Sequence, residues 1–231
     1  SIDVDSLCFP HIAYVGGTAT SDLRYAVWDG SQWQIQVIDS PGIGYYLSIV
    51  LDSSSNPHVA YHDNAGNNDL KYIYYDGSSW QTEVVDSTGN VGIWISVDLD
   101  GSGRPHISYY DPTNYIVKYA FHDGSGWQVQ ELDSNGGNWA CYTTIAVDTS
   151  NHPHISYFLG GVQDLKYAHH NGYAWQIETV DSLGSPGWYC SVKTDSGNRP
   201  HISYIYATEQ TLKYAYHNGV AWQFQTVDTV G

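Results

Sequence analysis

Residues 57–86 read PHVAYHDNAGNNDLKYIYYDGSSWQTEVVD and contain the three short patterns that decide the fold. Pro-His opens the stretch, Leu-Lys-Tyr stands in its middle, and Trp-Gln follows the turn at 76–79. Each pattern, allowing Val for Leu and Arg for Lys, occurs five times at spacings of 47 or 48 residues. The histidines are His11, His58, His106, His154 and His201, and the tryptophans are Trp33, Trp80, Trp127, Trp175 and Trp222. Three patterns that repeat in register indicate five copies of one structural unit.

Each copy holds four strand-like runs. In the second copy they lie at 48–52, 58–62, 70–75 and 80–86, rich in Ile, Val and Tyr and separated by Asn, Asp, Gly, Ser and Pro. No segment shows a sustained helical stripe. Four short strands per repeat of about 47 residues are typical of a β-propeller blade. We therefore predict an all-β, five-bladed β-propeller with four antiparallel strands per blade, each blade contiguous in sequence.

The repeats fill the whole chain, which indicates a single domain at 1–231. The expected blades are about 1–40, 41–87, 88–134, 135–182 and 183–231. The chain starts with a first strand and stops after a fourth strand. We therefore expect its two ends to lie side by side.

The turn Asp123–Trp127, Asp-Gly-Ser-Gly-Trp, resembles a shortened Asp-box of bacterial Asp-box/BNR-like propeller repeats. That motif joins the third and fourth strands and places a Trp between blades. Two copies carry Asn171 and Asn218 in place of Asp. In blade number and repeat length the chain also resembles tachylectin-type lectins. The resemblance implies a propeller fold, and no catalytic residue is carried over from it.

The amino-acid composition excludes some classes of binding partner. The chain is acidic, with 24 Asp plus Glu against 8 Lys plus Arg, a formal net charge of -16. Phosphate binding depends on cationic side chains, so we expect no nucleic-acid partner. No apolar run approaches the ~20 residues of a membrane span, so we expect no membrane insertion.

Three Cys and many Tyr, Trp, Asn, Gly and Ser favour an extracellular or cell-surface location. The chain has no Met, even at position 1, so we expect that upstream residues were removed.

The loops indicate which face carries function. If first strands line the channel, the loops from second to third strands share a face with the loops between blades. On the opposite face the turns are nearly the same in every copy. The second-to-third loops differ, as residues 62–68, 110–115 and 158–163 illustrate. A specific site is therefore expected on the variable face.

Aromatic residues are the main candidates for that site. Twelve residues before each of the last four Pro-His histidines stand Tyr46, Trp94, Tyr142 and Tyr189. They begin the innermost strands and should surround the channel mouth. Flat rings pack on the CH faces of sugars, while carboxylates and amides bind hydroxyls. The predicted ligand-binding residues are Tyr46, Trp94, Trp139, Tyr142, Trp188, Tyr189, Asp63, Asp111 and Asn114. The alternative is that these aromatics only pack blade against blade.

The repeated histidines do not indicate a metal site. Each follows a Pro at the start of a second strand, with its counterparts far away around the ring. Metal ligands must converge to ~2.0–2.1 Å from one ion, so we expect each His to bond a neighbouring turn. We expect no catalytic residue and no cofactor, with calcium at the loop 52–56 as the alternative. The Asp two positions before Lys71 and its counterparts predicts local ion pairs.

The three cysteines form no disulfide framework or zinc motif. Cys141 and Cys190 fall in equivalent loops of adjacent blades, so a bridge between them and two free thiols both stay open. Cys8 falls in a turn on the opposite face and is expected to be unpaired.

Three functions follow from these patterns. The first is a secreted or cell-surface non-catalytic binding module that binds glycans through the variable face, as a lectin does. The second is a structural subunit of an extracellular layer or filament, which self-assembles or binds other extracellular proteins. A polysaccharide lyase or glycosidase is the least favoured, because no carboxylates can be assigned to converge from different blades.

Overall fold

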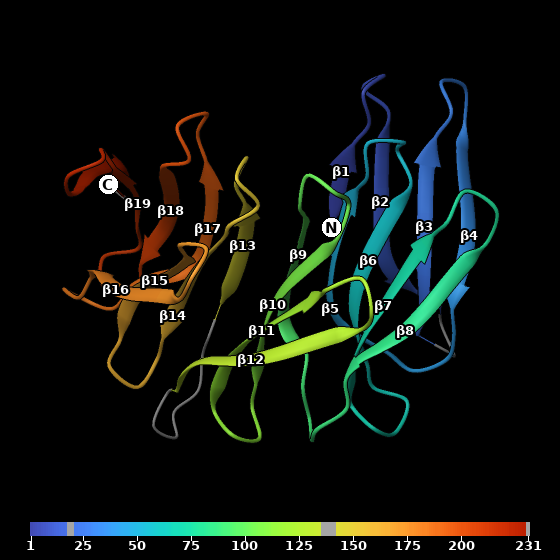
Figure 1. Cartoon of the computed structure of the whole chain (residues 1–231), viewed down its shortest axis with the longest axis horizontal. Coiled ribbons are helices and arrows are strands. Elements are labelled where there is room, and N and C mark those ends of the chain that lie inside the picture. Colours follow the sequence, from blue (N-terminus) through green and yellow to red (C-terminus); the bar gives the residue numbers. More distant parts are fainter. Residues whose placement is uncertain (18–20, 135–141, 230–231) are drawn as a thin grey trace.

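The fold consists of five four-stranded sheets, as the computed structural model of residues 1–17, 21–134 and 142–229 shows (Figure 1). In each sheet the strands follow sequence order, and neighbouring strands are antiparallel. The described residues contain no helix, and so no helix that is long and apolar enough to span a membrane. The predicted all-β fold of five contiguous blades is confirmed.

The strands of the five blades have the following bounds. Blade one contains β1 (Ile2–Val4), β2 (Pro10–Gly16), β3 (Asp22–Trp28) and β4 (Trp33–Asp39). Blade two contains β5 (Ile43–Leu51), β6 (Pro57–Asp63), β7 (Asp69–Tyr75) and β8 (Trp80–Asp86). Blade three contains β9 (Ile93–Leu99), β10 (Pro105–Asp111), β11 (Ile116–His122) and β12 (Trp127–Ser134). Blade four contains β13 (Thr143–Val147), β14 (Pro153–Leu159), β15 (Asp164–His170) and β16 (Trp175–Asp181). Blade five contains β17 (Pro186–Thr194), β18 (Pro200–Tyr206), β19 (Thr211–His217) and β20 (Trp222–Asp228).

The turn between the third and fourth strands is closed by its first residue. Asp123 Oδ1 accepts hydrogen bonds from the backbone N–H groups of Ser125 (2.8 Å) and Gly126 (3.0 Å). Asn171 Oδ1 accepts the two equivalent bonds, both 3.0 Å long, in its own turn. A side-chain oxygen at this position is what the turn requires, so Asn replaces Asp without loss of the structure.

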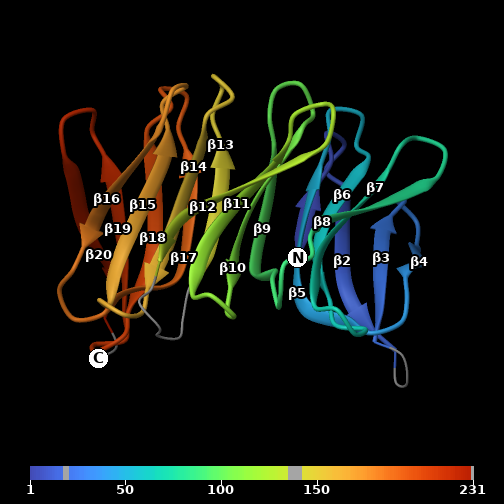
Figure 2. The same cartoon turned by 60° about the horizontal axis from the view of Figure 1, so that its bottom comes forward.

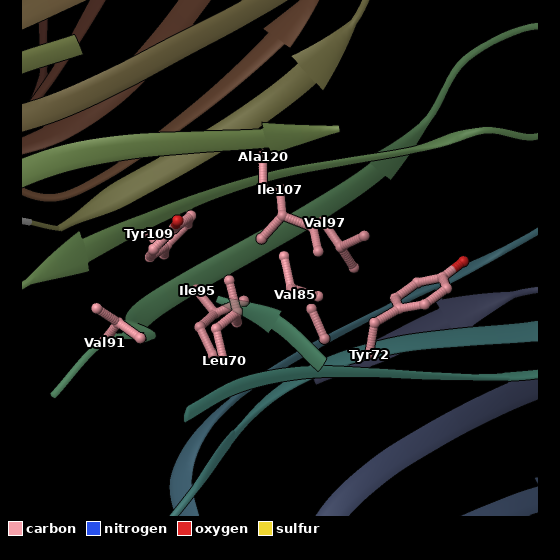
Figure 3. Packing of buried hydrophobic residues seen from close by; sticks show 10 residues of the cluster. Leu70, Tyr72, Val85, Val91, Ile95, Val97, Ile107, Tyr109 and Ala120 are labelled. Carbon is pink, nitrogen blue, oxygen red and sulfur yellow. The ribbon is translucent and has the colours of Figure 1, made fainter. Parts of the chain in front are cut away.

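The hydrophobic core lies between blades. Four buried clusters each draw residues from two successive blades, one cluster for each of the four junctions. Figure 3 shows the cluster between blades two and three, where Leu70 and Val85 face Ile95 and Ile107. A single blade therefore cannot bury its apolar face without a neighbour.

The same polar and aromatic contacts recur at every junction. The hydroxyl of a second-strand Tyr donates to the last Asp of the preceding blade, as in Tyr109 to Asp86 (2.8 Å). The fourth-strand Trp meets a third-strand Tyr of that preceding blade edge to face. These pairs are Tyr25 with Trp80, Tyr72 with Trp127, Tyr119 with Trp175 and Tyr167 with Trp222. The predicted position of this Trp between blades is confirmed.

Blade one and blade five lie at opposite ends of the array. Figures 1 and 2 agree that β1–β4 and β17–β20 are separated by the other three blades. The junction residues at these ends are uncovered: Val227 is 59% exposed, whereas its counterpart Val180 is 7% exposed. The prediction that the ends of the chain lie side by side was wrong, because the four junctions arrange the blades as a fan that does not bring blade five onto blade one.

The Pro-His histidines bond within their own blade. Nδ1 of His106 lies 2.6 Å from the Tyr119 hydroxyl, and its Nε2 lies 3.7 Å from Oδ2 of Asp100 in the preceding turn. The other four histidines have an equivalent Tyr and an equivalent Asp. The expected bond to a turn forms only at His154, whose Nε2 lies 3.3 Å from Asp148 Oδ2. At His58 and His201 the buried Nε2 has no hydrogen-bond partner among the described residues. The Tyr is the partner that all five share, and the sequence analysis did not identify it.

The expected local ion pairs form only in part. Arg24 pairs with Asp22 (3.2 Å) and Lys166 is 3.9 Å from Asp164. Lys71 instead binds Asp63 at 2.5 Å, so the pairing with the Asp two positions before it was wrong. The reason is the β6–β7 hairpin, which brings the end of β6 within reach of Lys71 across the strands.

Two of the three cysteines lie within the described residues. Cys8 is an exposed free thiol, as expected. Cys190 is a buried free thiol that donates to the carbonyl oxygen of Tyr142 (3.2 Å), and burial raises its pKa to about 12. Cys141 lies outside the described residues, and so does any bond that it makes.

Candidate functional site

Four aromatic side chains from successive blades converge at the start of the innermost strands. Tyr46 lies in β5, Trp94 in β9 and Tyr189 in β17, and Tyr142 directly precedes β13. The ring centroids of Trp94 and Tyr142 are 5.2 Å apart, those of Tyr46 and Trp94 5.8 Å, and those of Tyr142 and Tyr189 4.4 Å. The rings form a continuous row that we call the aromatic mouth.

The aromatic mouth borders a cavity of about 320 Å³. Besides its four rings, the cavity is lined by Tyr45, Leu47, Ile95, Thr143, Thr144 and Cys190. Tyr45 and Tyr189 are 88% and 64% exposed, so their rings are open to a ligand. Tyr46, Trp94 and Tyr142 are half-buried and also pack against the hydrophobic clusters. The inner rings therefore serve packing, while the outer rings remain accessible.

Irregular backbone presents these rings. Trp94 and Tyr189 have φ values of +49° and +51°, a left-handed conformation that costs a non-glycine residue roughly 1–3 kcal/mol. The strand register shifts beside both residues, between Ser108 and Tyr110 in β10 and between Trp188 and Ser191 in β17. Such bulges re-aim side chains. Thr143 Oγ1 donates to the Trp94 carbonyl oxygen (2.7 Å) and holds this backbone in place.

The cavity lining is uncharged. No Asp, Glu, His, Lys or Arg belongs to it among the described residues. Burial, followed by the adjacent Tyr189 hydroxyl, raises the pKa of Tyr142 to about 12, so its phenol stays neutral at physiological pH. The lining therefore offers rings and hydroxyl groups, which suit binding of a neutral ligand better than proton transfer.

Two of the predicted tryptophans are not part of this cavity. The Trp188 ring is 38% exposed and lies 6.1 Å from Phe158 and 6.5 Å from Tyr142, outside the lining. Trp139 lies outside the described residues.

The predicted polar residues support their loops; Asp63 and Asp111 are buried and Asn114 is exposed. Asp63 is bound by Lys71, and Asp111 by Lys118 at 3.1 Å. Asn114 Nδ2 donates to Asp111 Oδ2 (2.9 Å). None of the three lines the aromatic cavity. The structure thus does not bring them together with the rings, because neighbouring cations and N–H groups hold their side chains within the loops.

The threonines of the cavity were missed by sequence reasoning. Thr144 Oγ1 accepts the backbone N–H of Val192 in the next blade (3.0 Å). Ser48 and Ser96 accept the equivalent bonds from their next blades, each 3.2 Å long. The signal was present, since a Ser or Thr stands ten residues before every Pro-His histidine.

No group of three or more His, Cys, Asp or Glu among residues 1–17, 21–134 and 142–229 is placed to hold a metal ion. At the loop considered for calcium, Asp52 Oδ1 accepts the N–H groups of Ser54 and Asn56, both at 2.8 Å, and Oδ2 accepts the Asn56 amide (3.0 Å). The carboxylate closes the turn.

No family model and no curated protein matches the chain. Solved structures do match. A mutant of the Aleuria aurantia lectin in complex with Fucα1-6GlcNAc is 16% identical with a TM-score of 0.67, over 99% of this chain and 78% of that chain. A mutant of AofleA from Arthrobotrys oligospora is 12% identical with a TM-score of 0.69, over 99% and 71%.

An ulvan lyase bound to its saccharide is also similar, with 13% identity and a TM-score of 0.64 over 98% of this chain and 70% of that chain. At these identities the likeness concerns the fold. It places the chain in the β-propeller class, whose solved members include both lectins and polysaccharide-cleaving enzymes.

Proposed function

We propose that the protein is a non-catalytic carbohydrate-binding module that acts outside the cell and binds glycans at the aromatic mouth. The observation that carries this proposal is the convergence of Tyr46, Trp94, Tyr142 and Tyr189 on one uncharged cavity. Aromatic rings bordered by hydroxyl groups suit a sugar, which has apolar CH faces and a polar rim. The lectins among the similar structures support a glycan partner and a secreted or surface location.

The absence of paired carboxylates favours binding over catalysis. Glycoside hydrolysis commonly uses two carboxylates ~5–9.5 Å apart at the scissile bond. The cavity lining contains no carboxylate among the described residues. Asp98, a half-buried carboxylate on an innermost strand, accepts the N–H of Val147 in the next blade (2.8 Å) and thereby joins two blades.

A glycan array followed by isothermal titration calorimetry tests this proposal. Replacing Tyr45 or Tyr189 by Ala should weaken binding of the array hits by about tenfold or more, because an aromatic platform for a sugar is lost. Both rings are exposed, so the melting temperature should change little.

Tyr173→Ala is the matched control for these variants. Tyr173 is 95% exposed and lies in the β15–β16 turn on the opposite face, so its loss should leave binding unchanged. A protein that binds no glycan, or equal weakening by Tyr173→Ala and Tyr189→Ala, would refute the proposal.

A second candidate function is self-assembly, and exposed apolar side chains on outer strands favour it. Ile35 and Val37 on β4, and Phe224 and Val227 on β20, are all at least half exposed. Exposed apolar edge strands are typical association sites. Sedimentation velocity over a hundredfold range of concentration tests this function. Oligomers that Ile35→Lys disperses would support it, and a monomer at every concentration would refute it.

A further inference from the structure

The structure contains a second type of cavity, repeated at three blade junctions. These cavities measure about 160 Å³ between blades two and three, 200 Å³ between three and four, and 410 Å³ between four and five. Each is lined by the Pro-His histidine of one blade, the Pro-His proline of the next blade, a third-strand Tyr and a residue of the fourth strand. The lining is thus built from the same repeat positions each time.

Two of these repeat positions vary together. The first is the fourth-strand residue three after the Trp, and the second is the turn residue two before the Pro-His histidine of the next blade. Their pairs along the chain are Gln36 with Asn56, Glu83 with Arg104, Gln130 with His152, and Glu178 with Arg199. Glu and Arg occur together at two junctions, and the other two junctions have neither residue at these two positions, although Arg104 also lines the cavity beside Gln130.

The Glu and Arg of a pair do not bind each other. Both line the same cavity from different blades, yet no ion pair within 4.0 Å joins them among the described residues. Arg104 is held by Asp100, with Nε 2.7 Å and Nη2 2.6 Å from Oδ2, and Arg199 is held by Asp195 in the same way. No described residue binds Nη1 of either guanidinium, so this group can donate to a further acceptor.

Glu83 is likewise held with one oxygen free. Trp127 Nε1 donates to Glu83 Oε2 at 2.7 Å, and no described residue binds Oε1. The equivalent Trp175 Nε1 donates to Gln130 Oε1 at 2.8 Å, so the amide accepts the same bond. The acid is therefore not required to bind the Trp. The carboxylate of Glu83 faces the guanidinium of Arg104 across the cavity. This arrangement suits a ligand that donates one hydrogen bond to the carboxylate and accepts another from the guanidinium.

We propose that the Glu83–Arg104 and Glu178–Arg199 cavities each bind one neutral sugar residue, and that the two Gln junctions do not. A pair of adjacent hydroxyls suits the site, since the free carboxylate oxygen accepts from one and the guanidinium donates to the other. Tyr74 and His122 border the first cavity, and His169 and His217 the second, and these rings can pack on the CH face. The inference deepens the proposed glycan binding with two sites distinct from the aromatic mouth.

The two sites should differ in affinity. Glu83 is half-buried and fixed by Trp127, whereas Glu178 is exposed, and the equivalent Trp222 Nε1 has no described partner. A fixed carboxylate loses less conformational entropy on binding. We expect the Glu83–Arg104 site to bind more tightly.

Titration calorimetry tests the inference. The ligands are the methyl glycosides of fucose, galactose, glucose and mannose. The proteins are the whole chain and its Glu83→Gln and Glu178→Gln variants. Each variant should weaken its own site by about tenfold or more, since a charged acceptor is lost, and lower the stoichiometry by one. Gln occurs naturally at the other junctions, so the melting temperature should stay the same. Gln130→Glu combined with His152→Arg should add a site.

Glu131→Gln is the control. Glu131 is exposed and stands next to Gln130 on the same strand, so removing its charge should leave binding unchanged. If binding disappears in Tyr189→Ala but is unaffected by Glu83→Gln and Glu178→Gln, the inference is wrong while the proposed function stands. If none of the glycosides binds, the inference is wrong, and array binding alone decides the proposed function.

Discussion

The Pro-His histidines illustrate how single residues lock a blade. Because Nδ1 of His106 lies 2.6 Å from the Tyr119 hydroxyl, the side chain ties β10 to β11, and its Nε2 lies 3.7 Å from Asp100 in the preceding turn. Burial lowers the pKa of His106 to about 4, and burial also lowers the pKa of His58 and His154. These histidines are therefore neutral in the folded protein at physiological pH.

This neutrality predicts that acid lowers the free energy of unfolding at pH values above those at which carboxylates titrate. The unfolded chain binds a proton on each His near pH 6.5, whereas folded His106 binds it only near pH 4. Protonation thus favours the unfolded state as pH falls from 6.5 towards 4. We expect His106 alone to cost on the order of 2 kcal/mol between pH 7 and 5.

Urea unfolding followed between pH 7.5 and 5 measures this dependence. His106→Gln, which cannot titrate, should flatten the decline. A free energy of unfolding that is constant over this range would contradict the assignment of a lowered pKa to the histidines.

At the scale of strands, a repeated bulge directs one carboxylate into the next blade. The register of β7 and β8 shifts between Leu70 and Lys71, just before Asp86. Asp86 then accepts from the Tyr109 hydroxyl (2.8 Å) and from Lys118 Nζ (3.1 Å), both in blade three. Lys118 is buried and also 3.1 Å from Asp111. This cation thus joins two blades and one loop.

Replacing Lys118 by Met should therefore destabilise the protein strongly. The change leaves two buried carboxylates without their cation, which typically costs ~3–5 kcal/mol. Lys213→Met is the matched control, because Lys213 holds the same repeat position in blade five but lies over the Tyr206 ring at 3.8 Å. Its loss should cost about 1 kcal/mol or less. Chemical denaturation of both variants measures the difference, and equal costs would refute the role of the buried network.

At the scale of the whole molecule, periodicity accounts for most of what the sequence predicts. Five blades, the strand order and the meeting of Tyr46, Trp94, Tyr142 and Tyr189 all follow from equal spacing. The position of Trp188 does not, because the bulge after it changes the register locally. The partner of Lys71 depends on reach across a hairpin, and the arrangement of the end blades depends on the angle between blades. Spacing along the chain encodes neither quantity.

The separation of the end blades gives the last prediction. Tyr204 donates to Asp181 of the preceding blade (2.8 Å). The counterpart of Tyr204 in blade one is Tyr14, which has no described partner. The counterpart of Asp181 in blade five is Asp228, which is exposed. Tyr204→Phe should cost ~1.5–3 kcal/mol, because a hydrogen bond to a charged group is lost. Tyr14→Phe should cost less than about 0.5 kcal/mol. Urea unfolding measures both, and an equal cost for the two variants would show that blade five closes onto blade one in solution.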